Sequence, residues 1–200
     1  EDDFDGTGGT STCASGTDGD SPWASNWVDA GDPSVGYCNI SQTVANTDAE
    51  IVKDGAFSFG LRLKDKNVSA TRSVNLSGAT KAFLTFDYRR KSATLIAGRN
   101  ILVQASSDGL TFTTIYTIAG DGTTDAAYVT VYNQDITSYA SATSAIRFLT
   151  NNNVGDADTV YIDNVSIRYL KYPQCYITQL ASSSVPATYY MTTAAQKTMT

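Results

Sequence analysis

Hydrophobic and polar residues alternate along much of the chain between residues 57 and 170. In residues 57–63, Phe and Leu occupy every second position and are separated by Ser, Gly and Arg. Successive side chains of an extended strand point to opposite faces, so a period of two residues predicts a strand with one buried face. The other segments predicted to be strands are 70–76, 84–89, 101–105, 112–118, 128–132, 146–149 and 157–167.

Turn-forming residues separate these segments, and no amphipathic helix is predicted between them. Asp108-Gly109 predicts a hairpin turn, because this pair tolerates positive φ, and Gly120–Gly122 predicts a second turn. A single helical turn is expected at 136–139. Eight or more short strands joined by such turns predict an all-β fold with two packed antiparallel sheets.

The composition of the chain changes after residue 170. Residues 171–173 have the composition of a linker, and two short strand-like segments follow them. Two short strands cannot bury a core of their own, so this tail needs its own sandwich, another copy of the chain or further residues as a partner. We expect a β-sandwich at 1–170 and a β tail at 171–200, which is either a donor strand or the start of a second β module. The tail residues expected at a contact between subunits are Cys175, Tyr176, Ile177, Leu180, Tyr189 and Met191.

Charge and residue usage exclude several classes of function. The formal net charge is −6, which argues against nucleic acid as a partner, because nucleic-acid binders carry a basic surface. No apolar run is long enough to span a membrane. The chain has no histidine, so neither a Ser-His-Asp nor a Cys-His catalytic device can be built from it. No pair of carboxylates stands out as the acid and base of a glycosidase, and we expect no catalysis.

The acidic residues are almost all aspartate, with 18 Asp and 2 Glu. Loops and calcium sites use Asp well, whereas long helices favour Glu. Abundant Thr, Ser, Gly, Asn and Tyr complete a composition typical of an extracellular β-protein. We therefore expect an extracellular or cell-surface location, with Glu1 as a processed start.

The three cysteines are consistent with that location. Cys13 and Cys38 flank the tryptophan-containing loop region and could close it as a disulfide. Cys175 is then left over, and an odd cysteine in a secreted chain suggests a bond to another chain or to a missing segment. The alternative for Cys175 is an unpaired, buried thiol.

One acidic residue interrupts the strand predicted at 157–167. Tyr161, Asp163, Val165 and Ile167 share one parity, so a regular strand points Asp163 toward the face of its apolar neighbours. A carboxylate on a buried face requires a cation or several hydrogen-bond donors. Asp163 is therefore expected either to bind calcium or to accept hydrogen bonds from arginine or backbone amides.

Five short motifs occur in an order that resembles the MAM-like jelly-roll modules of large bacterial surface and secreted proteins. They are DDFDG at 2–6, LSGAT at 76–80, LTFDYR at 84–89, SSDG at 106–109 and YIDNV at 161–165. The resemblance covers about residues 1–170 and implies a two-sheet antiparallel jelly-roll sandwich. Such modules occur in adhesins, as carbohydrate-binding appendages and beside proteases. The tail is similar to the opening strands of SdrD B-like repeats, which are small stalk modules of surface proteins.

The resemblance also implies a structural calcium ion. In MAM-type domains an acid after a first-strand Phe and an acid in the last strand lie near one bound cation, and the matching residues here are Asp5 and Asp163. Asp3 and Asp32 are candidate helpers, because calcium takes six to eight oxygen ligands.

Two further sets of residues are candidates for ligand binding or modification. Trp23 and Trp27 could stack on a sugar ring, although loop tryptophans more often plug the end of a sandwich. The pattern Asn-X-Ser predicts glycosylation acceptors. Such patterns also arise by chance in a chain rich in Asn and Ser, and a fourth match, at Asn164, lies inside a strand. The three candidates retained are Asn39, Asn67 and Asn75.

Together these observations predict a non-catalytic extracellular structural or adhesive subunit. The unpartnered tail suggests that copies of the chain assemble head to tail into a surface filament by β-strand donation. The alternative is a carbohydrate-binding module of a secreted or surface protein, with glycans as partners. A third interpretation is a passive domain of a larger secreted enzyme.

Overall fold

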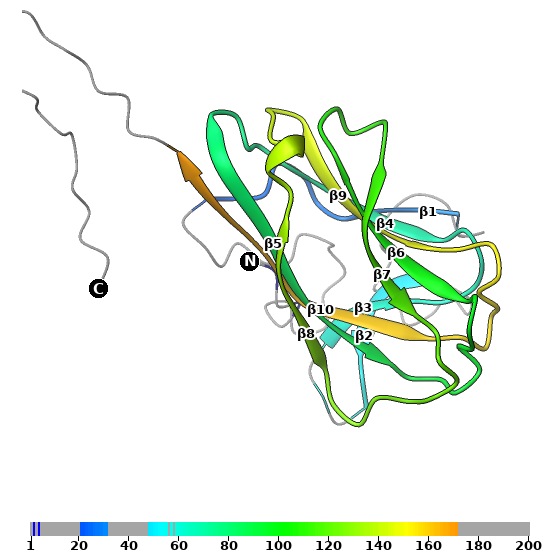
Figure 1. Ribbon diagram of the computed structural model, residues 1–200. Helices are drawn as coiled ribbons and strands as arrows, with labels where there is room; N and C mark the ends of the chain where they lie inside the picture. The colour runs from blue at the N-terminus through cyan, green and yellow to red at the C-terminus, as the bar shows by residue number, and fades with distance from the viewer. Residues whose placement is uncertain are drawn as a thin grey trace, which may run out of the picture.

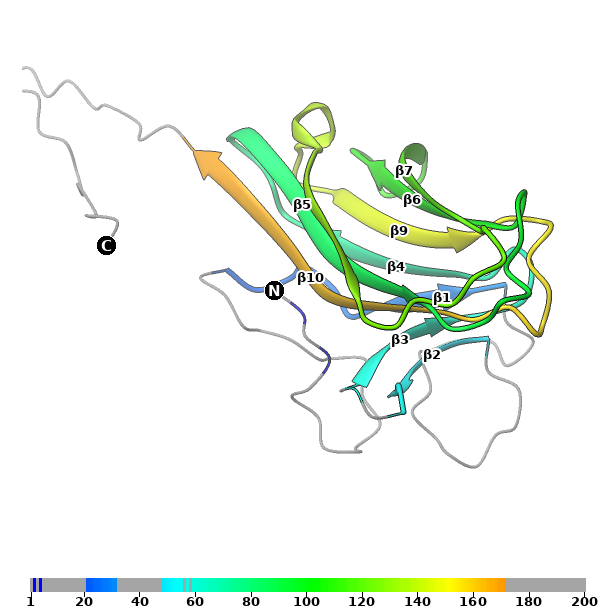
Figure 2. The same cartoon turned by 60° about the horizontal axis from the view of Figure 1, so that its bottom comes forward.

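The computed structural model describes residues 2, 4, 21–31, 48–55, 57 and 59–171. In this part of the chain, ten strands form two antiparallel sheets of five strands each, and the sheets pack face to face (Figures 1 and 2). The all-β sandwich prediction is therefore confirmed. The elements are β1 (Val28–Ala30), β2 (Ala49–Lys53), β3 (Phe59–Leu63), β4 (Ser69–Val74), β5 (Ala79–Arg90), β6 (Asn100–Ser106), β7 (Thr113–Ala119), β8 (Val129–Asp135), the 3-10 helix η1 (Thr137–Tyr139), β9 (Ser144–Thr150) and β10 (Val160–Lys171).

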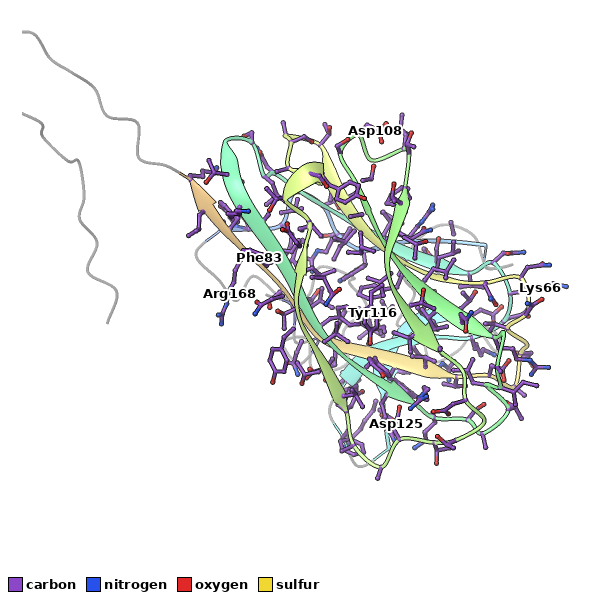
Figure 3. The ribbon with its side chains drawn as sticks, viewed as in Figure 1. Lys66, Phe83, Asp108, Tyr116, Asp125 and Arg168 are labelled. Atoms are coloured by element: carbon purple, nitrogen blue, oxygen red, sulfur yellow. The ribbon has the colours of Figure 1, made fainter. Side chains whose placement is uncertain are left out.

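The strand order is that of a jelly roll, because the chain repeatedly crosses between the two sheets. The first sheet has the order β1-β4-β9-β6-β7, and the second has the order β2-β3-β10-β5-β8. The predicted hairpin joins β6 to β7, and Asp108 lies at its tip (Figure 3). Gly109 has φ 71°, and Asp108 Oδ1 accepts hydrogen bonds from the backbone N–H groups of Leu110 and Thr111 at 2.8 and 2.7 Å.

Aromatic rings from both sheets meet in the centre of the core. Phe86 of β5 contacts Phe148 of β9 edge to face at a centroid distance of 5.4 Å, and Phe148 contacts Trp27 at 5.9 Å. All three side chains are buried. Burial of such large rings supplies much of the hydrophobic stabilisation of a sandwich, about 2–3 kcal/mol for each. Phe86 and Phe148 stand at alternating positions identified in the sequence, whereas Trp27 comes from the loop before β1.

The expectation that Asp163 shares the apolar face of its strand is wrong, because β10 contains a β-bulge. Asn164 has φ 48°, and the register between β10 and β5 shifts between Asp163 and Ser166. The extra residue reverses the side-chain parity. Val160 and Ile162 face the core before the bulge, and Val165 faces it after the bulge. Asp163 therefore lies on the outer face of the second sheet, where it is 7% exposed.

The long strand β10 organises the second sheet. It pairs with β5 from Val160 to Lys171, but with β3 only over Val160–Ile162. An isolated bridge joins Asp2 to Val165 through two backbone hydrogen bonds of 2.8 and 2.9 Å. The end of β10 projects beyond the body of the sandwich in Figure 2. The tail residues predicted at a subunit contact lie outside the described residues.

Candidate functional site

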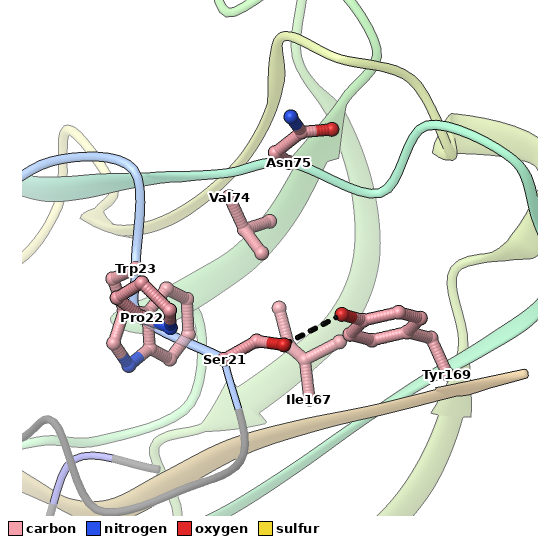
Figure 4. Close-up of a pocket in the computed structure, with 7 residues that line it drawn as sticks. All are labelled: Ser21, Pro22, Trp23, Val74, Asn75, Ile167 and Tyr169. Atoms are coloured by element: carbon pink, nitrogen blue, oxygen red, sulfur yellow. Dashed lines mark hydrogen bonds between the residues drawn. The ribbon is translucent and has the colours of Figure 1, made fainter.

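A small cavity lies between the end of β4 and the last part of β10 (Figure 4). Its volume is about 40 Å³. Two aromatic rings, two aliphatic side chains, a proline and two short polar side chains surround it, so apolar and hydrogen-bonding groups converge at one place. The lining residues are Ser21, Pro22, Trp23, Val74, Asn75, Ile167 and Tyr169.

The bulge in β10 supplies one wall of this cavity. Because the parity reverses at Asn164, Ile167 and Tyr169 pack on the core side of the strand. The hydroxyl groups of Tyr169 and Ser21 form a hydrogen bond of 3.0 Å across the cavity (Figure 4). Without the bulge, a regular strand would point both β10 side chains to the outer face.

The Arg72 guanidinium contacts the rings of both tryptophans beside the cavity. The Arg72 guanidinium carbon lies 4.7 Å from the centroid of the Trp23 ring and 5.7 Å from that of Trp27. Arg72 Nε donates to the Ser25 carbonyl oxygen at 3.0 Å, which ties the loop before β1 to β4. Cation–π contacts of a desolvated arginine contribute about 2 kcal/mol. Arg72 therefore helps to fix the position of the Trp23 ring beside the cavity.

Asp2 neutralises this buried cation. It is 0% exposed, and its Oδ2 accepts hydrogen bonds from Arg72 and, at 2.7 Å, from Trp27 Nε1. Its Oδ1 accepts a third, from the Phe4 backbone N–H at 3.1 Å. Neither Asp2 nor Arg72 is among the site residues predicted from the sequence. The signal that identifies them is an arginine at a core-facing position of 70–76, because a buried cation requires an acidic partner.

The two tryptophans have different positions. Trp27 is 1% exposed and packs against Phe4 and Phe148, so it is a core residue and not a stacking surface for a sugar. Trp23 is half-buried and lines the cavity. Only Trp23 therefore remains a candidate for stacking on a sugar ring.

Asp163 belongs to a separate polar cluster on the outer face of the second sheet. Its Oδ1 accepts a hydrogen bond of 2.7 Å from the Asn164 backbone N–H. Nearby, the side chains of Arg89 and Asp54 form a buried ion pair with an Nε–Oδ2 distance of 2.6 Å. Burial raises the pKa of Tyr128, and the negative charges of Asp54 and Asp163 raise it further. The cluster thus favours the neutral form of the tyrosine hydroxyl.

The calcium prediction is not tested by these residues. No group of three or more acidic or cysteine side chains that could hold a metal ion is present among the described residues. The other predicted ligands, Asp3, Asp5 and Asp32, lie outside them. The alternative prediction for Asp163 is that its carboxylate accepts hydrogen bonds from arginine or backbone amides, and the bond from the Asn164 N–H is of this kind. Calcium binding and hydrogen bonding therefore both stay open for this carboxylate.

The predicted modification sites are only partly described. Asn67 and Asn75 are exposed, and Asn75 lines the cavity. Asn39 lies outside the described residues, as do Cys13, Cys38 and Cys175, so both cysteine predictions stay predictions. Within the described ranges, no helix has the length and apolar character needed to cross a membrane.

Comparison with known proteins gives structural similarities only. No family model matches the chain, and no curated protein matches it, so the MAM-like and SdrD B-like resemblances stay predictions. The chain is similar to the K3 cleaved adhesin domain of Lys-gingipain from Porphyromonas gingivalis, with 14% identity, coverage of 70% of this chain and 88% of that chain, and a TM-score of 0.47.

Two carbohydrate-binding domains give comparable values. A xylan-binding domain of family 22 is 16% identical, covers 84% of this chain and 92% of its own, and has a TM-score of 0.48. The C-terminal family 22 carbohydrate-binding module of Clostridium thermocellum Xyn10B is 18% identical, covers 84% and 91%, and has a TM-score of 0.45. All three TM-scores lie below 0.5, and we base no functional argument on them.

Proposed function

We propose that the chain is a non-catalytic, extracellular adhesive module that binds a glycan at the Trp23 cavity. The observation that carries this proposal is the convergence of the Trp23 and Tyr169 rings with the Ser21 hydroxyl and the Asn75 amide. Sugars present apolar C–H faces beside hydroxyl groups. Binding sites for such ligands combine an aromatic surface with a few polar groups that fix orientation.

The size of the cavity limits how a glycan can bind. A volume of about 40 Å³ is far smaller than that of pockets that enclose a whole drug-sized ligand, roughly 300–1,000 Å³. We therefore propose that one substituent of the sugar, such as a hydroxymethyl group, enters the cavity. The rest of the glycan then lies across the opening of the cavity. Weak, multivalent binding is the expected behaviour of such a site in an adhesive protein.

The test combines a glycan array with tryptophan fluorescence. Trp27 is buried, so a fluorescence change on titration with a bound glycan should come from Trp23. Trp23→Ala should weaken binding at least tenfold. Tyr169→Phe, which keeps the ring and removes the hydroxyl, should weaken it several-fold. Tyr132→Ala is the matched control, because Tyr132 is an aromatic side chain of β8 that is 70% exposed and does not line the cavity.

Two results would contradict this proposal. One is an array on which no glycan binds the folded protein. The other is a bound glycan whose affinity is the same for wild type, Trp23→Ala and Tyr169→Phe. Circular dichroism of each variant separates a loss of binding from a loss of fold.

A second function, assembly by strand donation, is favoured by one edge of β10, along which no described strand pairs beyond Val165. Beyond the bridge at Val165, the only strand that pairs with β10 among the described residues is β5. A row of unpaired backbone groups on such an edge accepts an added strand. Leu170, at the projecting end, is 62% exposed. Residues 171–200, proposed as the donor, follow directly.

The tail and the edge can be tested separately. Removal of residues 172–200 should abolish high-molecular-weight species in size-exclusion chromatography and fibres in negative-stain microscopy. Ile167→Pro removes a backbone N–H from this edge, because the Val165 N–H two residues earlier bonds Asp2 on the same side of β10. In a variant whose circular dichroism is unchanged, it should have the same effect if this edge is the acceptor. Assembly that persists in both variants would exclude strand donation.

Calcium binding at Asp163 is retained as a proposal with a direct test. Added Ca²⁺ should raise the melting temperature of the chelator-treated protein, and Asp163→Asn should remove that rise, because ligand bound to the native state stabilises it. Asp121→Asn, at an exposed turn, is the control. A melting temperature that is equal in Ca²⁺ and in EDTA would exclude a structural calcium ion.

A further inference from the structure

Arg147 stands on the outer face of the first sheet. It lies in β9 between Ile146 and Phe148, which are 1% and 0% exposed and belong to the core. Alternation along the strand therefore directs Arg147 away from the core. Its side chain is nevertheless partly buried. Its cross-strand partners are Thr71 of β4 and Gln104 of β6, so it occupies the middle of the sheet and not an edge.

Three neighbours hold the Arg147 guanidinium in one orientation. Its Nε donates a hydrogen bond of 2.8 Å to Gln104 Oε1, and Gln104 Nε2 donates one of 3.1 Å to Thr114 Oγ1. The Phe112 ring covers one face of the guanidinium, with 3.9 Å between the ring centroid and Cζ. The Phe112 ring stacks on the flat face of the guanidinium, and Gln104 accepts the hydrogen bond from Nε. Neither of these contacts involves the two Nη atoms at the end of the side chain.

The charge of Arg147 is not balanced by an acidic side chain in the described part of the chain. Every other arginine there that is at least partly buried pairs with aspartate or glutamate. Burial lowers the pKa of Arg147, which is the sign of a cation that has lost water without gaining an anion. A planar carboxylate matches the Nη end of a guanidinium with two parallel hydrogen bonds.

We propose that Arg147 binds the carboxylate of an acidic sugar, such as a uronic acid, on the outer face of the first sheet. The partner chemistry follows from the surroundings. The chain has a net charge of −6, so it is not expected to bind a polyanionic nucleic acid. One arginine at this site can bind one carboxylate. The Phe112 ring and the Thr114 hydroxyl are groups that contact sugar rings and their hydroxyls. This site is separate from the Trp23 cavity, and its ligand is charged.

The experiment compares trigalacturonate with its fully methyl-esterified form by isothermal titration calorimetry. The ester keeps the sugar rings and removes the charge. Wild-type protein should bind the acid at least tenfold more tightly than the ester, and added salt should weaken binding of the acid. Arg147→Gln should reduce affinity for the acid at least tenfold, and Arg147→Lys should reduce it several-fold, because lysine cannot form the bidentate pair.

Two variants serve as controls. Arg168→Gln removes the same charge from an exposed side chain of β10 that points away from the sandwich (Figure 3), and it should leave the affinity unchanged. Tyr132→Ala removes an aromatic side chain of β8 that is 70% exposed and lies outside the Trp23 cavity, and it should also leave the affinity unchanged.

Several outcomes would overturn the assignment. They are no binding of trigalacturonate, equal affinity for acid and ester, equal affinity of wild type and Arg147→Gln, or equal loss in Arg168→Gln. If a short peptide rich in glutamate binds as tightly as trigalacturonate and with the same dependence on Arg147, the ligand is an acidic protein segment and the sugar assignment is wrong.

Discussion

The buried pair of Asp2 and Arg72 should make a large contribution to folding stability. Arg72 is 3% exposed and Asp2 is 0% exposed. Arg72→Met keeps much of the side-chain volume and removes the cation that pairs with the Asp2 carboxylate in the core, while the hydrogen bonds from Trp27 and Phe4 stay. Breaking a buried ion pair in this way costs about 3–5 kcal/mol. That is a large fraction of the roughly 5–15 kcal/mol that stabilises a typical domain.

Urea unfolding followed by tryptophan fluorescence measures this cost. With a slope of about 2 kcal/mol per molar urea, the midpoint of Arg72→Met should fall by about 1.5–2.5 M. Asp2→Asn should destabilise by a similar amount, because it removes the negative charge that pairs with the Arg72 guanidinium. The double variant Asp2→Asn/Arg72→Met should be more stable than the sum of the two single losses predicts, because it leaves no buried charge unpaired.

A loss of less than about 1 kcal/mol in either single variant, which is the range of an exposed ion pair, would contradict a strong buried pair. Losses that simply add in the double variant would contradict it as well. Arg62→Met, which removes an arginine from the more exposed pair with Glu50, is the matched control and should cost less. Arg72→Met should also disturb the Trp23 ring that its guanidinium supports.

Three further predictions concern acid stability, a close backbone approach and the bulge. Burial alone would raise the pKa of Asp125, but the hydrogen bonds and charge of Arg90 outweigh it, so this pKa lies below its ordinary value. The stability that this ion pair contributes is present above the ordinary aspartate pKa of about 4 and is lost as pH falls through the lowered pKa. Asp125→Asn should therefore flatten the acid side of a plot of urea midpoint against pH. A plot that is the same for wild type and variant would refute this. Gly120→Ala should cost about 2 kcal/mol or more in urea unfolding, because an added Cβ would clash with three carbonyl oxygens of the β5–β6 loop, whereas Gly98→Ala, with φ 89° and open space, should cost about 1 kcal/mol; equal losses would contradict the geometry. Asn164→Val should cost about 1–2 kcal/mol more than Asn164→Gly, since only the latter tolerates the positive φ of the bulge, and thermal melts that coincide would argue against it.

The fold followed from the sequence because its signals are local. Alternation at 101–105 and the Asp108-Gly109 turn each predict an element without reference to the rest of the chain, and β6, its turn and β7 lie there. The helical turn expected at 136–139 corresponds to η1. The second sheet brings together strands far apart in the sequence, such as β3 and β10, and alternation carries no information about such pairings.

The site could be predicted only in part, since its geometry depends on one residue and on distant partners. Alternation placed Asp163 inside, because the pattern cannot show an extra residue at Asn164 that reverses the parity. The same reversal brings Tyr169 to the cavity. The sequence leaves stacking and packing open for both Trp23 and Trp27, and the tertiary contacts of Arg72 and Asp2 distinguish the two rings.

The antiparallel ladder between β5 and β10 also determines how this protein would respond to mechanical force. Any pull on the polypeptide beyond Lys171 acts along the axis of β10, and β10 is paired with β5 along most of its length. Such a load shears the ladder, so many hydrogen bonds resist at the same time and do not open one after another. Tension applied to the chain beyond Lys171 would thus be borne by the longest strand pair in the second sheet.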